Sequence, residues 1–215
     1  MLQPADAANI ETIPLIGGQT ATVGDFKITV AHCQLADGGP SAACSGTLSL
    51  TATLSYVEGA QYVTATVEGS TGGPIFDALP GDTGTYDLSL LLSVQTLDGK
   101  GAIKSAALDV TGSADVANES KVGVGETVNG SSGHAIGTLN ATLASGATPL
   151  TFTPQSRILA NKDIFDKPAG LTGSDAMILS SVSQTYGLVP EPASVVVLLT
   201  GMASLGVLRR RRRRA

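Results

Sequence analysis

Apolar and polar residues alternate along most of the chain, and this pattern predicts β-strands. Phe26, Ile28 and Val30 alternate with polar or small neighbours, and Leu48 and Leu50 alternate with Ser and Thr. A period of two places the apolar side chains on one face of a strand, so each segment has one face for a core. The predicted strands cover residues 25–35, 46–56, 62–67, 86–94, 102–110, 134–143, 149–152 and 177–186.

Turn-forming residues gather in the gaps between these segments. Asp37-Gly38-Gly39-Pro40, Pro80-Gly81-Asp82 and Asp98-Gly99 are examples. Gly supplies positive φ and Pro pre-sets a bend, so such clusters mark tight connections. Many short strands at this spacing predict an all-β body, an antiparallel β-sandwich-like domain over residues 9–187. Only residues 157–165 show a stripe of helical spacing, which makes this window the one candidate helix of the body.

The end of the chain has a different pattern. Residues 193–208 form an uncharged apolar run of 16 residues. As a helix this run reaches roughly 24 Å, a short span for a hydrocarbon core of about 30 Å, and snorkelling arginines can cover the difference. The alternative is a buried core helix, but the basic block that follows favours one short C-terminal transmembrane helix. This membrane stop consists of Arg209, Arg210, Arg211, Arg212, Arg213 and Arg214.

A stiff segment, Val189-Pro190-Glu191-Pro192, stands directly before the apolar run. Each proline fixes φ and biases the residue before it towards an extended conformation. An extended segment beside a membrane is accessible to a processing enzyme, and the alternative is a simple linker that stops a helix. The three parts in this order, within residues 188–215, resemble the PEP-CTERM sorting signal of exported bacterial proteins.

The resemblance implies a route and a set of partners. The protein would be exported, held transiently in the inner membrane with its body outside, and processed near Pro190, Glu191 and Pro192 by an exosortase-type membrane enzyme. It would then reach the cell surface or the extracellular matrix, where this sorting system accompanies exopolysaccharide. The positive-inside rule agrees, because it keeps the arginines in the cytoplasm.

An exported protein also needs an N-terminal signal peptide, with a basic region and an apolar region. The first basic residue is Lys27, and residues 1–8 contain only Ala5-Asp6-Ala7, which fits a cleavage site. We therefore interpret residues 1–8 as a remnant of a signal-peptide region and expect the true start to lie upstream. The alternative is a protein that is not exported and whose tail is a permanent tail anchor.

The net charge of −5 conceals an uneven distribution. Residues 1–188 carry 17 acidic and 7 basic side chains, or about −10, whereas the tail carries Glu191 and six arginines, or about +5. An acidic body repels phosphate backbones, so we expect no nucleic-acid partner.

Cys33 and Cys44 are the two cysteines of the chain. An even count and a short intervening loop permit a disulfide in an oxidising compartment. It would join the two sides of a hairpin whose loop is residues 36–43. The alternative is a pair of unbonded buried thiols. Metal binding is disfavoured because the spacing is wrong for a zinc site and only His32 is nearby.

Signatures of enzymes are weak. His32 and His134 are the only histidines, and no G-x-S-x-G nucleophile context exists. Asp82-Thr83-Gly84 matches half of an aspartic-protease pair, but one occurrence in a turn indicates a turn. Four aspartates that could offer oxygens to Ca²⁺ lack the spacing of a known loop: Asp37, Asp82, Asp87 and Asp98. We expect a non-enzymatic protein with no catalytic residue, metal or cofactor.

Two classes of function fit these observations. The first is an exported surface or matrix protein that works by being displayed or released. The second is a ligand-binding β-sandwich module, with carbohydrate as the ligand. Sugar sites use exposed aromatic faces, and the scarcity of aromatics (4%, without Trp) weakens this second class. Its candidate aromatic residues are Tyr56, Tyr62, Tyr86 and Tyr186.

Overall fold

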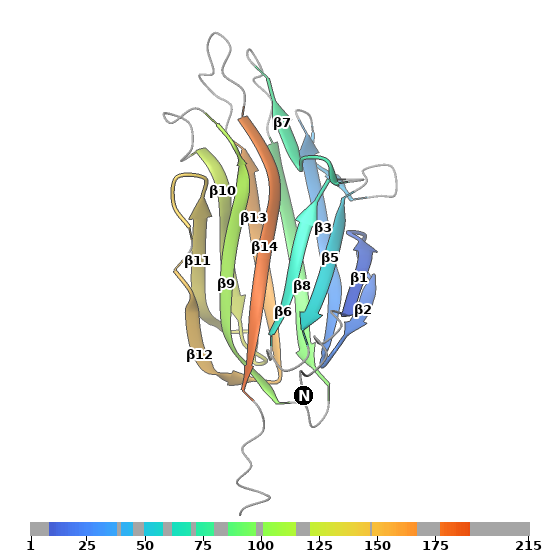
Figure 1. Ribbon diagram of the computed structural model, residues 1–215, viewed down its shortest axis with the longest axis vertical. Helices are drawn as coiled ribbons and strands as arrows, with labels where there is room; N and C mark the ends of the chain where they lie inside the picture. The colour runs from blue at the N-terminus through green and yellow to red at the C-terminus, as the bar shows by residue number, and fades with distance from the viewer. Residues whose placement is uncertain are drawn as a thin grey trace, which may run out of the picture.

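A computed structural model shows that the chain folds into two antiparallel β-sheets (Figure 1). The described residues are 9–37, 40–44, 50–57, 62–69, 72–79, 86–97, 101–114, 121–146, 148–166 and 177–189. The predictions for residues 1–8, for Pro190, Glu191 and Pro192, for the apolar run and for the arginines lie outside the described residues. Among those that are described, no helix is long and apolar enough to cross a membrane.

The first sheet has the strand order β1-β5-β6-β14-β9-β12, and β7 pairs with β14 beside this path. Its central strand, β14, is also its longest, with hydrogen-bonded neighbours on both sides. Its strands are β1 (Asn9–Pro14), β5 (Thr51–Val57), β6 (Tyr62–Glu68), β7 (Phe76–Ala78), β9 (Ala102–Ser113), β12 (Leu150–Gln155) and β14 (Met177–Val189).

The second sheet has the order β11-β10-β13-β8-β3-β2, and β4 pairs with β3. Figure 1 shows the two sheets face to face, with β13 and β8 behind β14 and β6. Its strands are β2 (Thr20–Val23), β3 (Phe26–Asp37), β4 (Ala42–Ala43), β8 (Tyr86–Thr96), β10 (Val122–Asn129), β11 (Ala135–Thr142) and β13 (Arg157–Asp166). The predicted all-β sandwich is therefore confirmed for the described body.

One hydrophobic core lies between the sheets. In β8, Leu88, Leu90, Leu92 and Val94 are buried and alternate with more exposed residues, except that Ser93 is also buried. This is the pattern that the sequence predicts, since period-two side chains of both sheets interdigitate in a sandwich.

The outer face of the first sheet is covered by paired hydroxyl groups instead. Thr64 lies 3.0 Å from Thr185 between their hydroxyl oxygens, and Thr66 lies 3.0 Å from Ser183. On the other side of β14, Ser181 lies 2.7 Å from Thr111. Cross-strand pairs of this kind stabilise a sheet, and here they use uncharged side chains.

The predicted helix at residues 157–165 is wrong, because this segment is the strand β13. Ile158, Ala160 and Ile164 face the core and so does Lys162, whose charge interrupts the apolar alternation in the sequence. Apolar side chains on the other face, at Leu159 and Phe165, add to the false helical spacing.

Strand β10 was not predicted, although it pairs with both β11 and β13. The alternation of apolar and polar residues in β10 is not evident in the sequence, because glycines stand at 123 and 125 and Glu126 faces inward. Gly123 is required by the close approach of the next strand, because a Cβ there would lie 2.3 Å from the carbonyl oxygen of Ala141.

Candidate functional site

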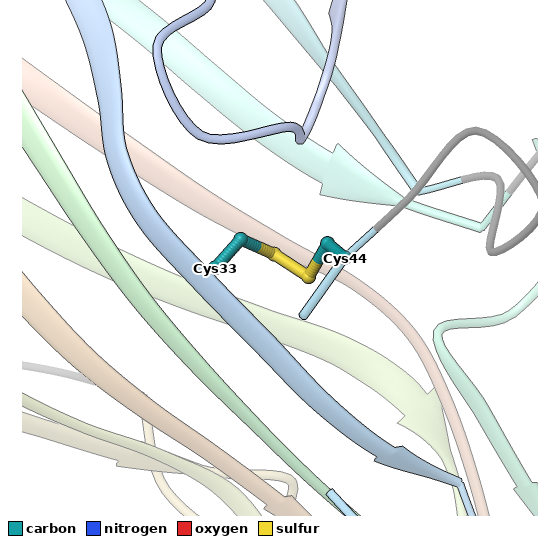
Figure 2. The surroundings of a disulfide bond; sticks show 2 residues. All are labelled: Cys33 and Cys44. Atoms are coloured by element: carbon teal, nitrogen blue, oxygen red, sulfur yellow. A yellow bond between two sulfur atoms is a disulfide. The ribbon is translucent and has the colours of Figure 1, made fainter. Parts of the chain in front are cut away.

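Cys33 of β3 and Cys44, just after β4, form a disulfide with their Cα atoms 5.3 Å apart (Figure 2). The short pairing of β3 with β4 brings them together, with Gln34 opposite Ala43 and Leu35 opposite Ala42. Both cysteines are buried, at 5% and 6% exposure. The bond therefore joins the two sides of this hairpin, as predicted. The predicted loop of residues 36–43 is too long, because Ala36 and Asp37 belong to β3 and Ala42 and Ala43 to β4.

Among the described residues, the histidine and acidic candidates do not converge on a chemical site. His32 and His134 are both exposed and lie on different strands or turns of the second sheet. Within the described ranges, no three side chains of His, Cys, Asp or Glu come together as metal ligands would. Asp82 and Asp98 lie outside those ranges.

A shallow groove lies on the outer face of the first sheet at the start of β6. The backbone pairing aligns Tyr62, Gly187 and Ser105 in one row across β6, β14 and β9. Tyr62 is 38% exposed, whereas the other three tyrosines, at 56, 86 and 186, are buried. Sequence alone offered all four tyrosines equally, and the structure leaves one of these four rings exposed.

The surface is hollow at this row because Gly187 has no side chain. A Cβ at this position would lie 2.4 Å from the hydroxyl oxygen of Ser105, so only glycine leaves the strand surface open beside the Tyr62 ring. Lys104 and Thr185 add an ammonium group and a hydroxyl group to the lining, and the hollow holds about 400 Å³. We call this feature, lined by Tyr62, Lys104, Ser105, Thr185 and Gly187, the Tyr62 groove.

A second polar feature lies inside the core, where sequence reasoning placed only apolar residues. The ammonium nitrogen of Lys162 on β13 donates hydrogen bonds to Glu126 Oε2 on β10 and to Gln184 Oε1 on β14. The three residues are 1%, 3% and 1% exposed. We call them the Lys162 cluster. Their only sequence signal was that Lys162 and Glu126 occupy inward positions of alternating segments.

The Lys162 cluster lies in a medium that disfavours charge. Burial lowers the pKa of Lys162, and the neighbouring Glu126 carboxylate opposes that shift. Burial raises the pKa of Tyr186 well above its usual value, and the charge of Glu126 raises it further. Within the described structure, Glu126 Oε1, Gln184 Nε2 and the Tyr186 hydroxyl lack a hydrogen-bond partner.

No family model and no curated protein matches the chain. Solved structures that match the chain weakly include the C-terminal domain of a chitobiase from Bacteroides fragilis, at 13% identity and a TM-score of 0.30, covering 80% of this chain and 99% of that one. The lectin domain of lectinolysin complexed with Lewis B antigen has 11% identity and a TM-score of 0.26, covering 56% and 89%. A family 29 carbohydrate-binding module from Piromyces equi has 9% identity and a TM-score of 0.22, covering 83% and 91%. These values are too low to assign a family or a ligand.

Proposed function

We propose that the chain is an exported, non-enzymatic protein of the cell surface or extracellular matrix, sorted through its C-terminal tail by an exosortase-type membrane enzyme. The observation that carries the proposal is the order of three parts in the tail: Val189-Pro190-Glu191-Pro192, the apolar run of residues 193–208, and six arginines. The Cys33–Cys44 disulfide supports export, because disulfides persist in oxidising compartments.

The end of β14 is compatible with processing at this motif. Val189 still pairs with Ala102, and Leu188 is 5% exposed, so the sheet extends to the residue before Pro190. A cut after Val189 therefore leaves every described strand intact. In this proposal the tail is a transient membrane anchor, the arginines remain cytoplasmic, and the released sandwich associates with exopolysaccharide.

The test is the intact mass of the protein from a host that carries an exosortase and from the same host without it. We expect loss of the segment beyond about Val189 only when the enzyme is present. Glu191→Gln in the motif should block processing and retain the protein in the membrane fraction, whereas the control Glu11→Gln should not. A full-length protein in the membrane fraction of both hosts would contradict sorting and support a permanent anchor.

The Tyr62 groove favours a second candidate function, the binding of carbohydrate. Its aromatic ring offers a stacking face, the hydroxyls of Ser105 and Thr185 offer hydrogen bonds, and Lys104 offers a positive charge. This combination suits an acidic polysaccharide better than a neutral one.

A glycan array with acidic and neutral polysaccharides tests this candidate. We expect binding to acidic glycans that is lost in Tyr62→Ala and weakened in Lys104→Met. The control Leu79→Ala, at an exposed apolar residue that does not line the groove, should bind as the wild type does. Absence of binding, or binding that survives Tyr62→Ala, would exclude the groove as a sugar site.

A further inference from the structure

The Lys162 cluster unites a primary amine, a carboxylate and a carboxamide in the interior. Lys162 and Glu126 face each other across neighbouring strands of the second sheet, and Gln184 reaches them from the central strand of the first. A buried ion pair is a weak source of stability, because removing two charges from water costs about as much as their attraction returns. The cluster therefore calls for a chemical explanation as well as a structural one.

The amine of Lys162 is positioned to attack the carboxamide. Its Nζ lies 2.5 Å from Gln184 Oε1. A carbonyl bond of about 1.2 Å added to this distance places Nζ within about 3.7 Å of Gln184 Cδ. Reacting atoms held about 3–3.5 Å apart in a fixed orientation gain much of the advantage of an intramolecular reaction.

Glu126 is positioned to move the protons. Its Oε2 accepts a hydrogen bond from Lys162 Nζ, and its Oε1 has no partner in the described structure. Burial lowers the pKa of Lys162, which favours transfer of a proton from the ammonium group to the carboxylate and frees the nitrogen lone pair. Gln184 Nε2, the atom that must leave, is also without a partner.

We propose that Lys162 and Gln184 join in an intramolecular isopeptide bond, with Glu126 as the proton relay. The Lys162 Nζ–Gln184 Cδ bond forms and the Gln184 Cδ–Nε2 bond breaks. Glu126 carries two protons in turn from the Lys162 nitrogen: the first goes to Nε2, which leaves as ammonia, and the second converts that ammonia into an ammonium ion. The ammonium form of lysine thus yields an amide and an ammonium ion, and Glu126 ends as the carboxylate it was, so no oxidant or cofactor is needed.

The carboxamide, rather than Glu126, is the electrophile. Glu126 must keep its carboxyl group free to accept and deliver protons, whereas the Gln184 carboxamide is neutral throughout and its nitrogen can leave once it is protonated. The two alternatives release different molecules: the Lys162–Gln184 bond releases ammonia, and a Lys162–Glu126 bond would release water.

The bond would connect the sheets. Lys162 belongs to β13 at the centre of the second sheet, and Gln184 belongs to β14 at the centre of the first. The Cys33–Cys44 disulfide, by contrast, joins residues of one sheet. A covalent link across the core would keep the sheets together even when the packing between them is lost.

The intact mass of the reduced, purified full chain is the decisive measurement. We expect a mass lower than that of the sequence by one ammonia molecule. Digestion with a protease that cuts after acidic residues separates Lys162 from Gln184 at Asp163 and Asp175. The two peptides should remain joined, and tandem mass spectrometry should place the link at these residues.

Variants distinguish a Lys162 that is joined to Gln184 by an isopeptide bond from a Lys162 that is only buried. Glu126→Gln and Lys162→Met should restore the full sequence mass, and the exposed control Lys104→Met should keep the deficit. An unchanged wild-type mass would overturn the proposal, and so would a deficit of one water molecule or a link at other residues. Because the wild-type mass decides by itself, a variant that fails to fold does not affect the outcome.

Discussion

The ring of Tyr56 occupies the space that a side chain at residue 24 would need. A Cβ added to Gly24, whose φ is +56°, would lie 2.1 Å from Tyr56 Cδ1. The ring is held there by a hydrogen bond of 3.1 Å from its hydroxyl to Asp25 Oδ2 and by an edge contact with Phe26, with ring centroids 6.2 Å apart. This contact connects the β2–β3 turn of the second sheet to β5 of the first.

Gly24→Ala is therefore expected to lower the free energy of unfolding by at least about 2 kcal/mol, because left-handed strain and steric overlap add together. Urea unfolding measures this loss. Gly18→Ala is the matched control: its φ is +91°, but nothing lies within 4 Å of an added Cβ. The control should lose only the cost of backbone strain, about 1–2 kcal/mol, and equal losses in both variants would disprove the role of Tyr56.

Reduction of the Cys33–Cys44 disulfide should lower the free energy of unfolding by about 2–3 kcal/mol, since the bond restricts the unfolded chain over a short loop. Thermal or urea unfolding with and without a reductant measures the change. The double variant Cys33→Ala/Cys44→Ala should be insensitive to the reductant. A wild type that unfolds identically in both conditions would contradict the prediction.

Tyr186 should make the protein sensitive to alkali. Its pKa is raised in the folded state by burial and then by Glu126, whereas an unfolded tyrosine ionises near about pH 10. Above that pH the folded state binds more protons than the unfolded state, so the free energy of unfolding falls as pH rises.

The urea midpoint of the wild type should therefore decrease above about pH 10, and Tyr186→Phe should decrease less. Near neutral pH, Tyr186→Phe should cost little, because it removes a buried hydroxyl without a partner in the described structure. Tyr62→Phe, at the exposed tyrosine, is the control and should follow the wild type. The titration of Lys162 changes the free energy of unfolding with pH in the opposite direction. This change is common to the wild type, Tyr186→Phe and Tyr62→Phe, and it is absent from all three if Lys162 is bonded. Parallel profiles of wild type and Tyr186→Phe would refute the assignment.

Gly187→Ala tests the Tyr62 groove without removing any of its polar groups. The added Cβ meets only the Ser105 hydroxyl, which can rotate, so the free energy of unfolding should fall by about 1 kcal/mol or less. Glycan binding should nevertheless weaken, because the methyl group fills the hollow beside Tyr62. Binding at wild-type strength would show that the ligand lies elsewhere.

Long strands with one apolar face were predictable, whereas the short strands β1, β2, β4 and β7 and the strands that carry unusual residues were not. β8 alternates over most of its length and is predicted, whereas the alternation of β10 is hidden by its glycines and Glu126, and that of β13 by Lys162. Local periodicity cannot foresee a charge placed inside, because the groups that accept it belong to strands distant in sequence. For the same reason, the sequence did not predict the Lys162 cluster or the row of Tyr62, Gly187 and Ser105: the residues in contact belong to strands that are distant in sequence.

The tail, unlike the strands, can be interpreted from the sequence alone. Its motif, apolar run and arginines follow one another along the chain, and the proposal for sorting depends on that order. The proposed glycan site depends instead on cross-strand neighbours such as Tyr62 and Gly187, and their proximity is known only when the register of β6 and β14 is known.

The hydroxyl pairs on the outer face of the first sheet have a further consequence. Thr64–Thr185, Thr66–Ser183 and Thr111–Ser181 carry no net charge, so dissolved ions do not screen them as they screen surface ion pairs. Nor do these hydroxyls titrate across the physiological range. The face thus keeps its internal bonding in fresh water, in brine and under mild acid, conditions that would successively weaken a surface built from lysine and glutamate.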